Sequence, residues 1–383
     1  TLLLFYMTQA TKEIEFIFLK FSIRDLPSAP LNHGGPMNLR IRRIPLVIFF
    51  GLLWLILSEG LLHAMPSVQR MVLPNRLILL VSEEHSLPFI TVHLLIDAGS
   101  RRDPSGEEGL ARLTARGLLL GTSSRTVTTF NEELDFMGAS LNASVGRDYA
   151  TLSLRVLKKD MEKGFALFID ALTQPAFPEE QIKREVEKTL GAIRSAEDDP
   201  GEVAEKEFQK TLFPGSPYGH PAEGTKESLP RLTRETITRF YQTHYHSNNA
   251  ILTIVGDISM DEVKGKLLPA LVKWPMGKVP TESFKSAFEK NHKTVRIDRP
   301  ITQANIILGH QGVSRNNPDY YALTVMNYIL GGGGFVSRLV EEIRIKRGLA
   351  YAVHSFFDPG KYPGSFQIVL QTKNASAHEA VSL

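Results

Sequence analysis

The sequence lacks cysteine altogether, which excludes disulfide bonds, iron–sulfur clusters, cysteine-ligated zinc and a cysteine nucleophile. It also lacks an excess of charge of either sign, since 44 Lys and Arg residues stand against 41 Asp and Glu residues. A net charge of +3, without a basic stripe interleaved with aromatic residues, argues against a nucleic-acid partner. With 43% hydrophobic and 22% charged residues, the composition is that of a globular chain of two or three domains.

Long hydrophobic runs are scarce too, and the clearest one lies near the N-terminus. The apolar run Ile44–Leu57 follows an arginine-rich segment, residues 40–43, and is shorter than the ~20 residues that span a bilayer. With a possible start at Met37, this pattern predicts a signal peptide over residues 37–64 and secretion across the inner membrane to the periplasm. Residues 1–36 are then expected to be an upstream extension. An uncleaved anchor is the alternative, and only in that case do we expect membrane attachment.

The remaining sequence contains one pattern twice. An apolar strand is followed by a polar turn, a helix, a hairpin of two strands whose first is entered through glycine, and then a further helix. The strand, the helix and the hairpin fall at residues 90–98, 108–120 and 138–157 in the first copy and at 304–310, 320–330 and 348–370 in the second. Strands followed by helices, with antiparallel hairpins, predict an α+β fold built from a duplicated unit.

These copies define the expected domains. We expect an N-terminal unit over residues 65–272, a polar linker with two prolines over residues 273–292, and a C-terminal unit over residues 293–383. The second copy stops just inside its second helix, so the repeat predicts that about 100 further residues belong to it. We therefore expect the C-terminal unit to be incomplete.

Several motifs, in a fixed order, carry a resemblance to a known family. They lie at residues 109–122, 213–219, 224–227, 255–257, 330–339 and 342–351. With these motifs the chain resembles the insulinase/pitrilysin family of zinc metallopeptidases over about residues 68–383, and within it the bacterial heterodimeric and mitochondrial-processing branch. The resemblance implies duplicated α/β sandwich units, the second of them truncated here.

The zinc-binding motif of this family is absent from the sequence. Active members carry H-x-x-E-H on the first helix, where two histidines hold zinc and the glutamate is the general base, and a further glutamate downstream completes the ligand shell. The matching positions here hold Arg112, Ala115, Arg116 and Ala192. A guanidinium stays protonated and cannot coordinate a cation. The resemblance therefore implies that this chain has no catalytic residue for water activation and binds no zinc of its own.

A second set of family positions is retained in the C-terminal copy. Arg344 and Tyr351 match an Arg/Tyr pair that the resemblance implies contacts the substrate near the scissile bond. A phenol can donate to an oxygen on which charge develops, and a guanidinium can hold a carbonyl. On spacing alone, Arg344 would be read as a solvated helix residue and Tyr351 as a core residue of a strand.

The glycine run just before this pair has three interpretations. The run consists of Gly331, Gly332, Gly333 and Gly334. A phosphate-binding loop is disfavoured because no Lys-Ser/Thr follows. A helix C-cap with its loop is the ordinary interpretation. The resemblance adds a glycine-rich loop that contacts substrate, which would suit the close approach of an extended peptide.

These observations lead to one functional hypothesis and two alternatives. The resemblance implies a non-catalytic, substrate-binding subunit of a heterodimeric zinc metalloendopeptidase, whose partner supplies H-x-x-E-H and the zinc, and whose substrates are peptides or unfolded proteins. The first alternative is a catalytically inactive structural or binding protein of the same fold. The second is an independently active peptidase with a relocated metal site. The pair His244 and His246 offers no obvious third metal ligand and is interpreted as surface histidines at a helix end.

Overall fold

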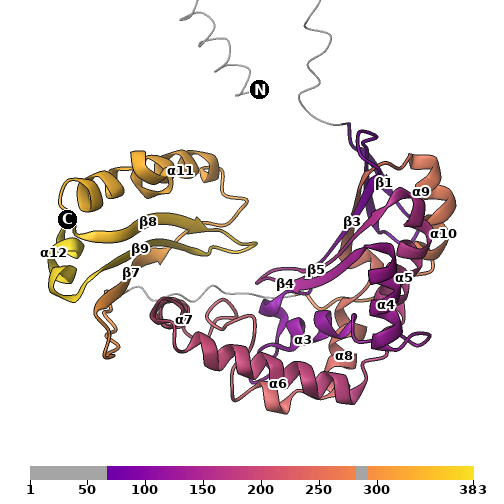
Figure 1. The fold of residues 1–383 in the computed structure, drawn as a ribbon, viewed down its shortest axis with the longest axis horizontal. Coiled ribbons are helices and arrows are strands. Elements are labelled where there is room, and N and C mark those ends of the chain that lie inside the picture. The colour runs from indigo at the N-terminus through magenta and orange to yellow at the C-terminus, as the bar shows by residue number, and fades with distance from the viewer. Residues whose placement is uncertain (1–66, 282–290) are drawn as a thin grey trace, which may run out of the picture. The chain divides into compact units, whose positions relative to one another are not determined.

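The computed structural model describes residues 67–281 and 291–383, all within one compact unit that begins at Met65 (Figure 1). The predicted upstream extension and signal peptide lie outside the described residues. Within the two described stretches, no helix combines the length and the apolar character that crossing a membrane requires.

The N-terminal copy is built on a six-stranded sheet. Its strands are β1 (Gln69–Val72), β2 (Ile78–Glu83), β3 (Phe89–Ile96), β4 (Ser140–Val145), β5 (Ala150–Leu157) and β6 (Ala250–Gly256). They are ordered β1-β2-β6-β3-β5-β4, so β4 lies at an edge and pairs with β5 alone. Only the β2–β6 pair is parallel, and the other pairs are antiparallel.

Helices cover this sheet and bury its apolar side chains. They are α3 (Leu110–Gly117), α4 (Val127–Met137), α5 (Met161–Thr173), α6 (Glu179–Ala196), α7 (Pro200–Leu212), α8 (Arg234–His244), α9 (Met260–Lys266) and α10 (Leu268–Leu271). Helices α3, α4 and α5 pack against strands β4 and β5 (Figure 1). Alternate residues of β3 are buried, from Ile90 to Ile96, and belong to the same core as Phe168 of α5. Full burial of each such side chain contributes about 1.5–3 kcal/mol.

Local capping explains where several helices begin and end. The hydroxyl of Thr126 accepts a hydrogen bond from the Thr129 N–H at the start of α4, and Gly138 ends that helix at a φ of 58°. Asp199 caps α7 by accepting from the Gly201 N–H, with Pro200 in the first turn. The acidic segment before Pro200 therefore ends one helix and begins the next.

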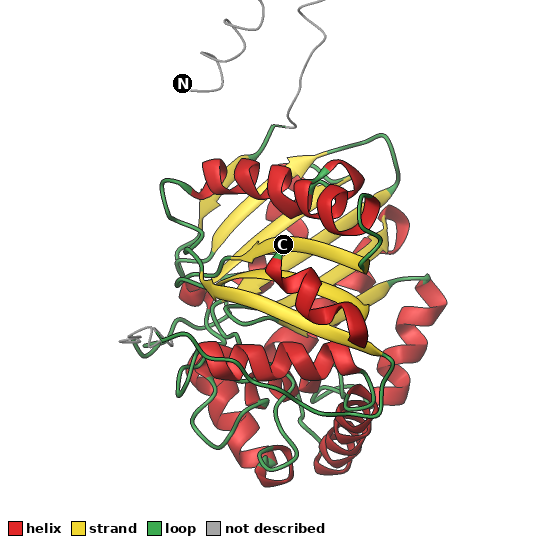
Figure 2. Ribbon diagram, turned by 90° about the vertical axis from the view of Figure 1, so that its left-hand side faces the viewer, coloured by secondary structure: helices red, strands yellow, loops and turns green. Residues whose placement is uncertain are grey.

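The C-terminal copy contains a three-stranded sheet. Its strands are β7 (Gln303–Gln311), β8 (Ala350–Asp358) and β9 (Ser365–Lys373), and its helices are α11 (Tyr320–Asn327) and α12 (Ala377–Ser382). The antiparallel order β7-β9-β8 repeats the order β3-β5-β4 of the first sheet. Helix α11 packs against β8, and α12 packs against β9 (Figure 2). The duplicated α+β unit predicted from the sequence is therefore confirmed.

Helix α9 ends before Leu267 and α10 begins after it, because Pro269 has no N–H to continue the hydrogen bonding of α9. The linker expected over residues 273–292 differs from the structure at its start. Trp274 is 1% exposed, and its indole N–H donates to the Tyr245 carbonyl at 3.2 Å, so this residue belongs to the N-terminal copy. The carbonyl of Pro275 accepts a hydrogen bond from the Ser247 N–H, and that of Pro280 accepts one from the Arg102 side chain. Residues 282–290 lie outside the described part of the chain.

Candidate functional site

Helices α3 and α6 bring together three of the four positions at which the zinc site is lost. Arg112 and Arg116 lie one turn apart on α3, and Ala192 lies on α6 opposite them. These side chains border a cavity of about 330 Å³. Its full lining is Arg112, Arg116, Ala143, Ser144, Val145, Glu185, Lys188, Thr189 and Ala192. Ala115 is 1% exposed and packs in the core instead, so it does not border the cavity.

The cavity carries more positive than negative charge. Its charged residues are Arg112, Arg116, Lys188 and Glu185. Arg116 Nε lies 3.2 Å from Glu185 Oε1, and Lys188 Nζ lies 3.9 Å from Glu185 Oε2. The carboxylate of Glu185 is therefore shared by two cations. The formal charge of the lining is +2, since three cations surround one carboxylate.

These residues do not fit a zinc ion. Guanidinium and ammonium groups have no lone pair to donate, so Glu185 is the one strong ligand in the lining, whereas catalytic zinc takes three protein ligands. Nowhere in residues 67–281 and 291–383 do three or more His, Asp or Glu side chains gather as a potential metal site. Sequence reasoning missed Glu185 and Lys188. Their places seven and four residues before Ala192 on one helix would have put them on the same face.

The start of α3 is held by a buried carboxyl group. Asp103 accepts hydrogen bonds from the N–H groups of Gly109 at 2.8 Å and Ala111 at 2.7 Å. Burial raises the pKa of Asp103 to about 8, and Glu108 and Glu107 act in the same direction, while the two backbone donors oppose the rise. Gly109 has a φ of 95°, and a Cβ there would lie 2.9 Å from backbone atoms of residues 223 and 224. These contacts fix the direction in which α3 presents its arginines.

The structure also brings Arg344 and Tyr351 together. Arg344 lies in the π-helical segment Val340–Ile345, with its guanidinium carbon 6.0 Å from the centre of the Tyr351 ring and 5.1 Å from that of Phe335. Tyr351 is the extra residue of a β-bulge between Ala350 and Ala352, and it is 71% exposed. Bulges redirect side chains, which explains why this tyrosine faces solvent and not the core. Contact of the pair with substrate stays a prediction.

The glycine run has a structural explanation at three of its four positions. Gly331 is buried, and a Cβ there would lie 2.5 Å from the Ser355 hydroxyl oxygen. Gly334 has a φ of 62°, a conformation that glycine adopts without strain. Gly332 and Gly334 are solvent-exposed and Gly333 is half-buried. A Cβ at Gly333 would lie 2.6 Å from the Tyr328 carbonyl oxygen, so close packing accounts for Gly331 and Gly333, and the turn accounts for Gly334. Contact of the run with substrate stays a prediction.

Comparison with known proteins decides the family. Residues 79–226 match the model described as insulinase (peptidase family M16), and residues 231–383 match the one described as peptidase M16 inactive domain. An uncharacterized zinc protease of Rickettsia bellii is 31% identical over 310 residues, which cover 78% of this chain and 72% of the relative. The chain belongs to peptidase family M16. The insulinase family, predicted from the motifs, and the α+β fold, predicted from the repeated pattern, are thereby confirmed.

Other M16 relatives differ in their described activity. A non-peptidase homolog of Helicobacter pylori is 27% identical, with 79% of this chain and 69% of the relative covered. A probable mitochondrial-processing peptidase subunit beta of Arabidopsis thaliana is 26% identical, with 82% and 61% covered. The crystal structure of a peptidase M16 inactive domain from Pseudomonas fluorescens matches with a TM-score of 0.73 and 30% identity, covering 80% of this chain and 74% of that one.

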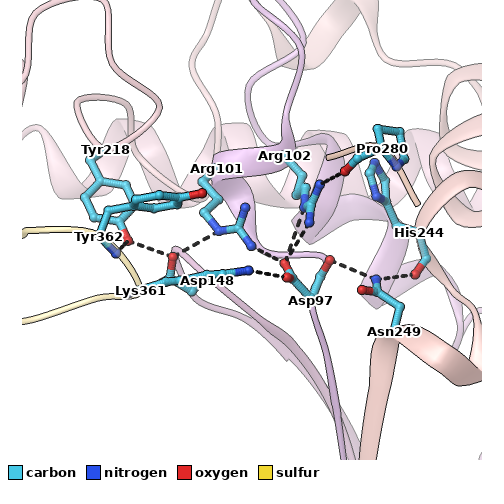
Figure 3. A network of polar contacts seen from close by, with 10 residues as sticks. All are labelled: Asp97, Arg101, Arg102, Asp148, Tyr218, His244, Asn249, Pro280, Lys361 and Tyr362. Atoms are coloured by element: carbon cyan, nitrogen blue, oxygen red, sulfur yellow. Dashed lines mark hydrogen bonds and ion pairs between the residues drawn. The ribbon is translucent and has the colours of Figure 1, made fainter. Parts of the chain in front are cut away.

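A polar network in this M16 chain joins the end of β3 to a loop of the C-terminal copy (Figure 3). Asp97 pairs with Arg101 and Arg102 and lies 2.7 Å from Lys361 Nζ. Burial works against ionisation of Asp97, but Lys361 and the two arginines outweigh it and lower the pKa of this carboxyl. Asp148 accepts from the Tyr218 hydroxyl at 2.7 Å and from the Lys361 N–H at 2.8 Å. Sequence reasoning missed this network, because its members are far apart in the chain.

His244 differs from its predicted place on the surface. It ends α8 as expected but is 7% exposed, packed 4.5 Å from the Phe240 ring centre, whereas His246 is half-buried. Burial lowers the pKa of His244 to about 4, and Arg102 and Arg101 nearby act in the same direction. The imidazole is therefore neutral at pH 7.

Proposed function

We propose that this M16 chain is a non-catalytic, substrate-binding subunit of a heterodimeric zinc metalloendopeptidase. The observation that carries the proposal is the cavity between α3 and α6, where Arg112 and Arg116 stand in place of zinc ligands. Their side chains offer no lone pair to a metal and no base for water. The zinc, its ligands and the general base would then come from a partner chain with H-x-x-E-H.

The contribution of this chain would lie at Arg344 and Tyr351. The tyrosine is exposed, and the arginine lies beside it, so both can reach a bound peptide. The Tyr351 hydroxyl would donate a hydrogen bond to the carbonyl oxygen that becomes negative as water attacks, and the Arg344 guanidinium would hold a neighbouring carbonyl. The exposed glycines of the run, Gly332 and Gly334, would allow the peptide backbone to approach closely.

Two of the relatives favour this division of labour. One is described as a non-peptidase homolog and another as a subunit of a processing peptidase. The family thus includes a homolog without peptidase activity and a subunit of a peptidase, and this supports a chain that assists cleavage without activating water itself. The proposed substrates are peptides or unfolded protein segments, and the proposed location is the periplasm, after removal of residues 37–64.

The proposal is tested by co-expressing this chain with an H-x-x-E-H relative that is encoded next to it in the genome, and by then measuring peptide cleavage by the pair. We expect Tyr351→Phe to lower kcat about 100-fold, because it removes one hydrogen-bond donor to the developing oxyanion. Tyr321→Phe is the matched control, since Tyr321 is also exposed and lies on α11. An unchanged rate in both Tyr351→Phe and Arg344→Ala contradicts the shared site, and stoichiometric zinc in the purified lone chain contradicts the loss of the metal.

A structural or binding role without catalysis is the second candidate, favoured by the non-peptidase relative. It predicts assembly with a partner but no peptidase activity in any combination. Cleavage that requires both chains separates the two functions.

A further inference from the structure

We infer that the cavity between α3 and α6 is a binding site for a carboxylate, and that it selects peptides with an acidic side chain or a free C-terminus. The cavity is lined by Arg112, Arg116, Lys188 and Glu185 together with small residues of β4 and α6. The preference for peptides rests on the proposed function, whereas the binding of the anion rests on the cavity alone.

The charges of the cavity leave room for an anion. Glu185 is engaged at both oxygens, by Arg116 and by Lys188, and its side chain is 11% exposed. Arg112 has no acidic partner among the described residues, although it borders the same cavity. An added carboxylate would reduce the formal charge of the lining from +2 to +1. A cation would raise it, so the site favours anions.

The shape and chemistry of the walls favour a carboxylate. Arginine presents planar pairs of N–H donors that match the two oxygens of a carboxylate. A volume of about 330 Å³ exceeds a carboxylate group and admits several atoms of the chain that bears it. Ala143 is buried and Val145 is half-buried, so the cavity is apolar on the side of β4, where an ion pair is stronger than in open water.

The neighbouring strand indicates why the carboxylate would belong to a peptide. The cavity is bordered by Ala143–Val145 of β4, and β4 is an edge strand that pairs with β5 alone. An edge strand presents unpaired backbone groups to which an extended peptide can bind. A peptide along β4 would place a side chain or its terminus beside Arg112 and Arg116.

Binding to the purified full chain, without any partner, tests this inference. The probes are fluorescent peptides of one sequence that carry Glu, carry Gln in its place, or end in a C-terminal amide, and their Kd is measured by anisotropy at low and physiological salt. We expect the Glu peptide to bind about 10-fold more tightly than a Gln peptide with an amidated end, and salt to reduce the difference. Equal affinity for all probes overturns the inference.

Variants with opposite expected effects keep the test decisive. Arg112→Gln and Arg116→Gln should each weaken binding of the Glu peptide about 10-fold, whereas Glu185→Gln should tighten it, because a competing carboxylate is removed. Arg184→Gln is the control, since Arg184 is an exposed arginine of α6 outside the cavity lining. Tighter binding in Arg112→Gln, or weaker binding in Glu185→Gln, overturns the inference.

Competition distinguishes a site for a carboxylate from a site for phosphate. Inorganic phosphate and glutarate are added to the complex with the Glu peptide. Displacement by glutarate at lower concentration than phosphate supports a carboxylate site, and the reverse order overturns it. Because the partner is absent, failure here leaves the cleavage test of Tyr351→Phe intact, and failure of that test leaves this binding result intact.

Discussion

Replacing Asp148 should weaken both the N-terminal copy and its contact with the loop around Lys361. The carboxylate of Asp148 is nearly buried and lies 3.0 Å from Arg101 Nε, whose side chain is 1% exposed. It also accepts from the Tyr218 hydroxyl and from the Lys361 N–H (Figure 3). Asp148→Asn keeps the size of the side chain but removes its charge, so the loss can be attributed to electrostatics.

The expected loss in the free energy of unfolding follows from the burial of the Asp148–Arg101 pair. Breaking a buried ion pair by removing one partner costs about 3–5 kcal/mol, because the remaining charge stays desolvated. Arg101 keeps its contact with Asp97, so we expect the low end, about 3 kcal/mol. Asp358→Asn is the matched control. Asp358 lies 2.8 Å from Arg147 Nη1, but its side chain is 43% exposed, and exposed pairs contribute less than about 1 kcal/mol.

Urea unfolding at pH 7, followed by circular dichroism and by tryptophan fluorescence, measures the free energy of unfolding of the two variants and the parent chain. The reasoning is refuted if Asp148→Asn and Asp358→Asn destabilise the chain equally. It is also refuted if Asp148→Asn lies within about 1 kcal/mol of the parent, because the network would then behave as an exposed ion pair.

Two further perturbations test burial and close packing. The pKa of His244 falls from 6.5 to about 4 on folding, because burial disfavours the charged imidazole. The contribution of the neutral imidazole to the free energy of unfolding is therefore present above pH 6.5 and is lost as the pH falls towards 4. It amounts to at most about 3 kcal/mol, and His244→Gln should flatten the decline of the urea midpoint between pH 7 and 4.5. An unchanged decline contradicts this. In Gly360→Ala the new Cβ would lie 2.3 Å from the Tyr218 hydroxyl and 2.7 Å from Asp148 Oδ2, so we expect a loss of about 1–3 kcal/mol by the same assay. Gly265→Ala, with no atom within 4 Å, should cost nothing, and equal effects would contradict the steric argument.

Local patterns in the sequence were sufficient for most elements of the two repeated patterns. Alternation of apolar residues located β3 and β5, and helical periodicity over residues 108–120 located α3, whereas α4 was not predicted. The copy of this pattern in the second half predicted that β7, α11, β8 and β9 follow one another along the chain, and the structure decided their order in the sheet, β7-β9-β8. The expected start of the linker was wrong at Trp274, because a packing partner distant in the sequence buries this side chain.

The sequence by itself determined the family, the duplicated α+β unit and the chemistry of the replaced zinc positions. Motifs and residue types can be recognised from the order of residues alone, and an arginine cannot bind a cation in any fold. Tertiary structure alone decided which charges meet. It placed Glu185 and Lys188 against Arg116, turned Tyr351 outward through a bulge, and joined Asp148 to Lys361. Such contacts depend on how helices and strands pack across long sequence separations, and pair energies depend on burial, which periodicity does not reveal.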